Sequence, residues 1–120
     1  MPTLAVVLVA FVALLHVYFL VLEMFFWTKP AGRRAFGTTQ EQAEQSKVLA
    51  MNQGLYNGFL AAGLLWGLTL GAAGRGVLIF FLVCVIVAGI FGAATASRKI
   101  LWVQAVPAAL ALLAVVLGVR

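Results

Sequence analysis

The sequence predicts an all-α fold, namely a polytopic membrane protein built as an up-down-up-down four-helix transmembrane bundle. Of the 120 residues, 65% are hydrophobic and 9% are charged, whereas a soluble domain carries about 25% charged residues. The mean hydropathy is +1.15. The apolar residues form four runs of about 20 residues or more, each long enough to cross roughly 30 Å of hydrocarbon as a helix.

The first span is expected at about residues 3–27, where Pro2 suits a first helical turn and the 28–32 segment stops the helix. The other spans are expected at about 49–70, 76–96 and 100–119. Each span is predicted to be helical, because a backbone in lipid must satisfy its own hydrogen bonds.

Residues 28–48 form the only substantial polar segment and are interpreted as an amphipathic cytoplasmic linker. Thr39 followed by Gln42 resembles a capping box, which predicts a short helix that leads into the second span. The remaining connections, at 71–75 and 97–99, are short. Short connections make neighbouring helices antiparallel, so residues 1–120 are expected to form a single domain.

The distribution of basic residues predicts one orientation. One side of the membrane would carry six of them and the opposite side two. Since cytoplasmic loops carry the excess of Lys and Arg, the prediction is a multi-pass protein of the bacterial inner membrane with both termini non-cytoplasmic. The six are Lys29, Arg33, Arg34, Lys47, Arg98 and Lys99, and the two are Arg75 and Arg120.

Small residues recur at four-residue spacing, as in Gly54, Gly58 and Ala62, and again in Gly63 and Gly67. Such stripes let helix backbones approach closely in lipid. Packing within one bundle is the main interpretation, and a homodimer through the glycine stripes is the alternative. Near the start of the fourth span, Pro107 is expected to kink the helix, because proline cannot donate the hydrogen bond to Val103.

Glu23 is the most informative residue, because an ionisable group inside a span costs on the order of 2.5–3.5 kcal/mol and normally faces the protein interior. His16 precedes it by seven residues, and two helical turns place both on nearly the same face. Alternatively, Glu23 could reach the interface or pair with a basic loop residue, and His16 could be a neutral core residue.

Several further polar residues are expected at the depth of Glu23, in the cytoplasmic half of the spans. Together they suggest a polar ligand pocket, with individual Asn and Gln residues alternatively serving as interhelical hydrogen-bond partners and Tyr56 as an interface anchor. With Glu23 and His16, the predicted ligand-binding residues are Asn52, Gln53, Tyr56, Asn57 and Gln104.

Other classes of function find little support. Basic residues lie between apolar runs and lack the clustered face with stacking aromatics that nucleic-acid binding needs. Cys84 is the single cysteine, which excludes an intrachain disulfide. One His and one buried Glu make a poor metal site, so neither metal nor cofactor is expected. A carboxyl group in an apolar surrounding suits proton exchange, and whether the protein is an enzyme stays open.

Two stretches carry a family resemblance: residues 16–28, which read HVYFLVLEMFFWT, and residues 50–61, which read AMNQGLYNGFLA. With Phe36-Gly37 between them, they resemble the small integral membrane proteins of domain-of-unknown-function family 1304. The resemblance covers essentially the whole chain. It implies a four-helix membrane protein and brings no activity and no catalytic residues.

The leading functional hypothesis is a membrane protein that binds a small amphipathic molecule or a membrane lipid through a pocket centred on Glu23. One alternative is a small proton-coupled exporter, since small multidrug transporters also have four short spans and a Glu in the first helix. Another is a structural helper subunit that contacts a second membrane protein through the glycine stripes.

Overall fold

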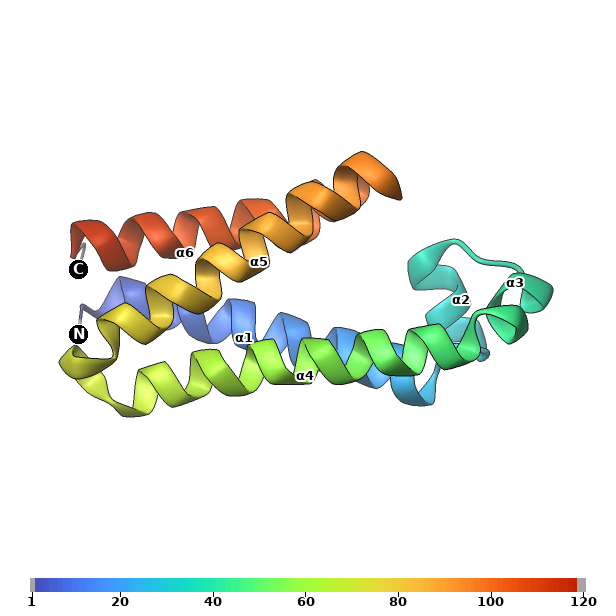
Figure 1. The fold of residues 1–120 in the computed structure, drawn as a ribbon, viewed down its shortest axis with the longest axis horizontal. Helices are drawn as coiled ribbons and strands as arrows, with labels where there is room; N and C mark the ends of the chain where they lie inside the picture. Colours follow the sequence, from blue (N-terminus) through green and yellow to red (C-terminus); the bar gives the residue numbers. More distant parts are fainter. Residues whose placement is uncertain (1, 119–120) are drawn as a thin grey trace. The chain divides into compact units, whose positions relative to one another are not determined.

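A computed structural model describes residues 2–118 and shows helices throughout this range (Figure 1). No strand occurs within these residues, so the predicted all-α class is confirmed. In chain order the elements are α1 (Thr3–Phe25), α2 (Pro30–Phe36), α3 (Gln40–Gln45), α4 (Lys47–Thr69), the 3-10 turn η1 (Gly71–Gly74), α5 (Arg75–Thr95), the π-helical turn η2 (Leu101–Ala105) and α6 (Val106–Leu117). Val119 and Arg120, which enter the predicted fourth span and the charge count, lie outside the described residues.

Two helical stretches are long and apolar enough to cross a membrane by length and composition: Thr3–Phe25 and Gly71–Thr95. Helix α4 is as long as α1, with 23 residues. It is not one of these two stretches, because its first half carries polar residues such as Asn52 and Gln53. The last apolar stretch, Leu101–Leu117, is shorter. Two of the four predicted spans therefore have this support.

The chain groups into two compact units, which we treat separately. Unit 1 comprises residues 2–14 and 60–118 of the described chain, and unit 2 comprises residues 15–59. Unit 1 thus contains the start of α1, the end of α4, and all of α5, η2 and α6. Unit 2 contains the end of α1, both short helices and the start of α4.

The core of unit 1 is built from small and branched apolar side chains. Leu64 of α4 and Leu78 and Leu82 of α5 are fully buried, and each helix of the unit contributes to one contiguous cluster. From α1 come Ala5, Val9, Val12 and Ala13, and from α6 come Ala108, Ala111, Ala114 and Val115. The many alanines let helix backbones approach closely.

Two glycines of unit 1 lie where helices contact each other closely. A Cβ atom at Gly89 of α5 would come within 2.8 Å of the Cβ atom and the backbone nitrogen of Ala105. Gly67 similarly faces Leu78. These glycine faces are therefore occupied by other helices of the same chain, and a homodimer through them stays a prediction that competes with the internal contacts.

A π-helical turn ends two residues before Pro107, and the predicted kink itself stays a prediction. The backbone N–H of Val106 donates to the carbonyl of Leu101, five residues back, and η2 comprises the five residues before Val106. Proline has no N–H to continue the regular helical ladder, and one wider turn is a common local response to such an interruption.

The linker of unit 2 is more ordered than the sequence predicts. Helix α1 ends at Phe25, shortly before the predicted stop at residues 28–32. Within that segment a new helix, α2, begins at Pro30. Proline is favoured in a first helical turn, and Gly37 ends α2 in a left-handed conformation with φ of 66°. The predicted capping box is confirmed: Gln42 N–H donates to Thr39 Oγ1 at the start of α3.

Candidate functional site

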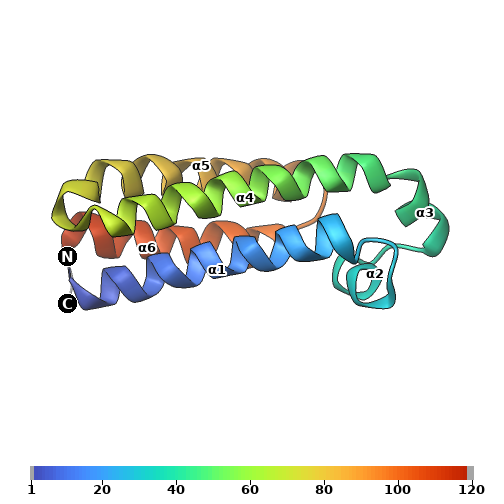
Figure 2. The same ribbon diagram turned by 90° about the horizontal axis from the view of Figure 1, so that it is seen from below.

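A buried polar pair joins α1 to α4 within unit 2, where the two helices lie alongside each other (Figures 1 and 2). The side-chain amide of Asn57 donates a hydrogen bond to Glu23 Oε1. Glu23 is 5% exposed and Asn57 is 6% exposed. Within the described residues Glu23 forms no ion pair with a Lys or Arg, so the carboxyl group faces the protein interior and contacts an amide of the neighbouring helix.

Glycines on α4 bring the two helices close enough for this bond. A Cβ atom at Gly54 would come within 2.7 Å of Met24 Cγ and 3.1 Å of Glu23 Cβ, and one at Gly58 would come within 2.7 Å of Leu20 Cδ1. Because Asn57 lies three residues after Gly54 on the same helix, it shares the face that contacts α1. The backbone of α4 is thus close enough for a short side chain to reach Glu23.

Glu23 is placed against the local preference of its helix. It lies in the last turn of α1, two residues before Phe25, and this turn contains no basic residue. The helix macrodipole favours cations at this end and disfavours carboxylates. An acidic side chain at this position therefore does not stabilise α1, and burying the Glu23 side chain does not stabilise it either.

His16 is fully buried on the same face of α1. Its ring lies edge-on to Phe19, with ring centroids 5.5 Å apart and planes at 73°. The seven-residue separation from Glu23 corresponds to about 10 Å along the helix, so the two side chains are too far apart for a direct hydrogen bond. A water molecule or a ligand would be needed to connect them.

The other predicted site residues are distributed differently. Asn52, Gln53 and Tyr56 precede Asn57 on α4, but all three are exposed, and Tyr56 packs edge-on against Phe59. Gln104 is half-buried in the η2 turn of unit 1. Unit 2 therefore brings Glu23 and Asn57 into contact, while the exposed three lie on the outer surface of α4.

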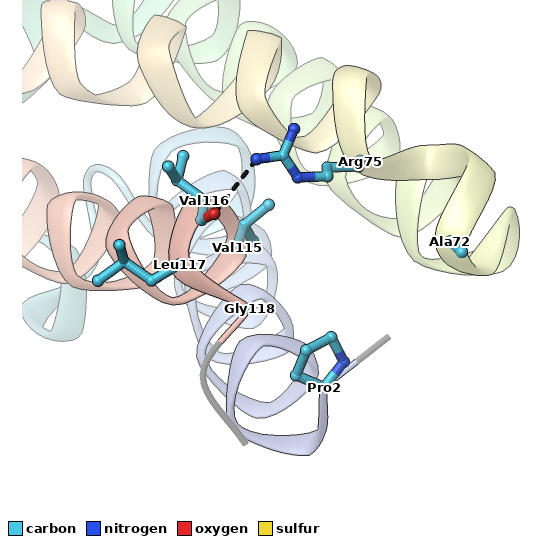
Figure 3. Close-up of a pocket in the computed structure, with 7 residues that line it drawn as sticks. All are labelled: Pro2, Ala72, Arg75, Val115, Val116, Leu117 and Gly118. Atoms are coloured by element: carbon cyan, nitrogen blue, oxygen red, sulfur yellow. Dashed lines mark hydrogen bonds between the residues drawn. The ribbon is translucent and has the colours of Figure 1, made fainter.

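A cavity of about 230 Å³ lies in unit 1 and contains none of the seven predicted site residues. It is lined by Pro2, Ala72 and Arg75 together with residues 115–118 at the end of α6 (Figure 3). The Arg75 side chain donates to the carbonyl of Val116 at 3.2 Å. This contact places a cation at the C-terminal end of a helix, which the macrodipole favours, and is readily explained as a helix cap.

The Glu23 pair can form hydrogen bonds and ion pairs and can exchange protons. Within the described residues no group of three or more His, Cys, Asp or Glu side chains could hold a metal ion. A buried carboxyl group next to an amide offers hydrogen-bond acceptors and, when ionised, one negative charge to a ligand. Such a pair suits recognition of a small polar or cationic headgroup.

Comparisons with known proteins confirm the family resemblance. A family model described as "Protein of unknown function (DUF1304)" matches residues 10–116. The chain is also 32% identical over 115 residues to "Uncharacterized protein YpaA" of Lactococcus lactis subsp. lactis (strain IL1403), a match that covers 94% of this chain and 97% of that protein. No solved structure matches.

Proposed function

Because the chain belongs to the DUF1304 family, whose description names no activity, we propose a function from the geometry of the site. The protein is a four-helix integral membrane protein that binds a small amphipathic molecule or lipid, with the polar head of the ligand at Glu23. The observation that carries this proposal is the buried hydrogen bond between Glu23 and Asn57.

Energies distinguish binding from a purely structural role. A hydrogen bond between membrane helices contributes about 0.6 kcal/mol on average and about 1.7 kcal/mol at most. A carboxyl group costs on the order of 2.5–3.5 kcal/mol at the centre of a span and less near its end, where Glu23 lies. Well-packed apolar residues could join the same helices without burying a polar pair. A residue that is unfavourable for the fold is best explained by function.

Four of the remaining predicted site residues have a place in this proposal, and Gln104 of unit 1 does not. Asn52, Gln53 and Tyr56 lie within two turns of Asn57 on the exposed surface of α4, where they can contact the headgroup of an approaching lipid. His16 lies deeper along α1 and fully buried, where it can exchange a proton with a bound ligand.

The test uses a fluorescent lysophosphatidylethanolamine titrated into the detergent-solubilised protein. Replacing Glu23 with Gln keeps an acceptor for Asn57 but removes the negative charge, so we expect the thermal stability to hold and the affinity to fall about tenfold, as for loss of one charged hydrogen bond. Glu44→Gln is the matched control, because Glu44 is exposed and also accepts from an amide, Gln40 Nε2, at 2.9 Å. Equal affinity of the Glu23→Gln variant and the wild type would refute the role of Glu23.

A proton-coupled exporter is the second candidate, favoured by the burial of His16 two turns from Glu23 on one face of α1. Dual orientation in the membrane would support kinship with small multidrug transporters, whereas the six-to-two distribution of basic residues favours a single orientation. Single cysteines at Thr39 and Ala72, in a Cys84→Ser background, distinguish the two. We expect a membrane-impermeant maleimide to label only position 72 in intact cells, and labelling of both positions would favour the exporter.

A further inference from the structure

Helix α2 carries a cluster of cations without partners. Lys29 is the N-cap residue of α2, and Arg33 and Arg34 lie in its last turn. Within the described residues none of these three side chains has a hydrogen bond or an ion pair, and the Nε atom of Arg33 is buried with no acceptor. In the part of the chain that the structure describes, the acidic side chains of α3 form no ion pair with these cations; Glu41 and Glu44 accept hydrogen bonds from Gln45 and Gln40.

The cluster is held firmly at the end of α1. Gly32 is buried against the backbone at Phe26 and Trp27, and a Cβ atom there would come within 3.0 Å of Trp27 Cα. The ring of Trp27 packs against Phe36, with centroids 5.0 Å apart, and its Nε1 donates to Ser46 Oγ at 3.1 Å. Contacts at Gly32 and Phe36 therefore hold α2, which carries the two arginines, against the end of α1.

Exposed aromatic side chains border the cations. Phe25 is 66% exposed, Phe26 is 43% exposed, and Phe36 at the end of α2 is 39% exposed. They lie where α1, a helix long and apolar enough to cross a membrane, ends. Aromatic residues together with Lys and Arg at the end of an apolar helix are typical of the boundary between lipid tails and headgroups.

We propose that α2, with the exposed phenylalanines at the end of α1, is a binding surface for anionic phospholipid headgroups. The guanidinium groups of Arg33 and Arg34 bind phosphate oxygens through charge-assisted hydrogen bonds, and Lys29 adds a third positive charge. Phe25 and Phe26 contact the upper part of the acyl chains. This inference rests on the proposed membrane location but not on the proposed ligand at Glu23.

Charge complementarity favours an anionic membrane surface over other partners. Three unpaired cations lie within six residues, and no acidic residue occurs between Glu23 and Glu41. Basic groups next to a membrane bind anionic lipids with about 1 kcal/mol each. The exposed aromatic residues suit the boundary between lipid tails and headgroups.

The test is native mass spectrometry of the full chain in detergent with an equimolar mixture of dioleoyl-phosphatidylglycerol and dioleoyl-phosphatidylcholine. We expect the wild type to retain phosphatidylglycerol preferentially. In an Arg33→Gln/Arg34→Gln variant the ratio of retained phosphatidylglycerol to phosphatidylcholine is expected to fall about 30-fold. The matched control, Arg98→Gln/Lys99→Gln, removes the same charge from the connection after α5 and should keep the preference.

A charge-neutral variant tests the geometry. Gly32→Val is expected to displace α2 from the end of α1 and to weaken the preference for phosphatidylglycerol, although no charge is removed. The Glu23 site is tested by the affinity for lysophosphatidylethanolamine and this surface by the preference for phosphatidylglycerol, so failure of one and failure of the other give different results. Equal retention of both lipids by the wild type would overturn the inference and would favour an acidic protein partner at this surface instead. An equal loss in the Arg98→Gln/Lys99→Gln control would also overturn it, because general charge would then explain the binding.

Discussion

The two units of the molecule bury different kinds of side chain. The cluster at the centre of unit 1 consists of Ala, Val and Leu residues, whereas unit 2 buries His16, Glu23 and Asn57. An apolar core can discriminate ligands only by shape, because it offers no directional hydrogen bond. Unit 2 combines acceptors, donors and charge, and recognition is therefore expected there.

Helix contacts in both units nevertheless follow one rule. Gly89 lies against Ala105 in unit 1, and Gly54 lies against Glu23 and Met24 in unit 2. In each case the missing side chain lets two backbones approach closely, which is a main source of helix association in lipid. The comparison teaches that close packing is common to both units, whereas the polar pair is an addition of unit 2 that packing does not require.

The largest expected effect is in the apolar core of unit 1. Leu64→Ala should lower the free energy of unfolding by about 3 kcal/mol, because Leu64 is fully buried and its removal leaves a cavity. The measurement is equilibrium unfolding in mixed micelles. Leu65→Ala is the control, since Leu65 is 45% exposed and should change stability far less. Equal losses in both variants would contradict the burial seen for Leu64.

A smaller effect is expected when the polar pair of unit 2 is broken on one side. Asn57→Leu should cost about 2 kcal/mol, because the buried carboxyl group of Glu23 loses its donor. The double variant Glu23→Leu/Asn57→Leu should recover most of this loss, since no buried polar group is left unpaired. Unfolding of the single and double variants under the same conditions measures both. A double variant as unstable as Asn57→Leu would show that the pair stabilises the fold by more than its hydrogen bond.

The smallest effect concerns two glycines of α5. Gly89→Ala should destabilise by about 1 kcal/mol, because the new methyl group would overlap Ala105. Gly76→Ala has open space around it and should stabilise by roughly 0.5 kcal/mol, because alanine restricts the unfolded chain. Thermal unfolding of both variants in detergent gives the comparison. Equal shifts would argue against close packing at Gly89.

Much of the local structure was predictable from the sequence. Apolar runs correctly predict the long apolar helices α1 and α5, and the Thr39–Gln42 pattern correctly predicts the start of α3. Helix α2 was not predicted. Lys29 and Pro30 were interpreted as a signal that stops a helix, but a proline also fits the first turn of a new helix. The wide η2 turn was not predicted either, since proline indicates an interruption but not the form it takes.

The candidate site was also predictable only in part from the sequence. Composition singles out Glu23 as a costly residue in an apolar helix, but three exposed residues and one buried residue share the first half of α4. Asn57 contacts Glu23, whereas Asn52, Gln53 and Tyr56 face outward. The rotation of α4 about its axis decides which of them is buried, and that rotation depends on packing at Gly54 and Gly58.

The sequence by itself determined the helical class, the long apolar stretches and the family, because hydropathy, helix caps and sequence similarity are local properties of the chain. The tertiary structure alone decided that Asn57 binds Glu23 and that α2 is held against the end of α1. Both depend on how close two helices come and which faces they turn toward each other. These quantities arise from packing between segments far apart in the sequence, which no local pattern encodes.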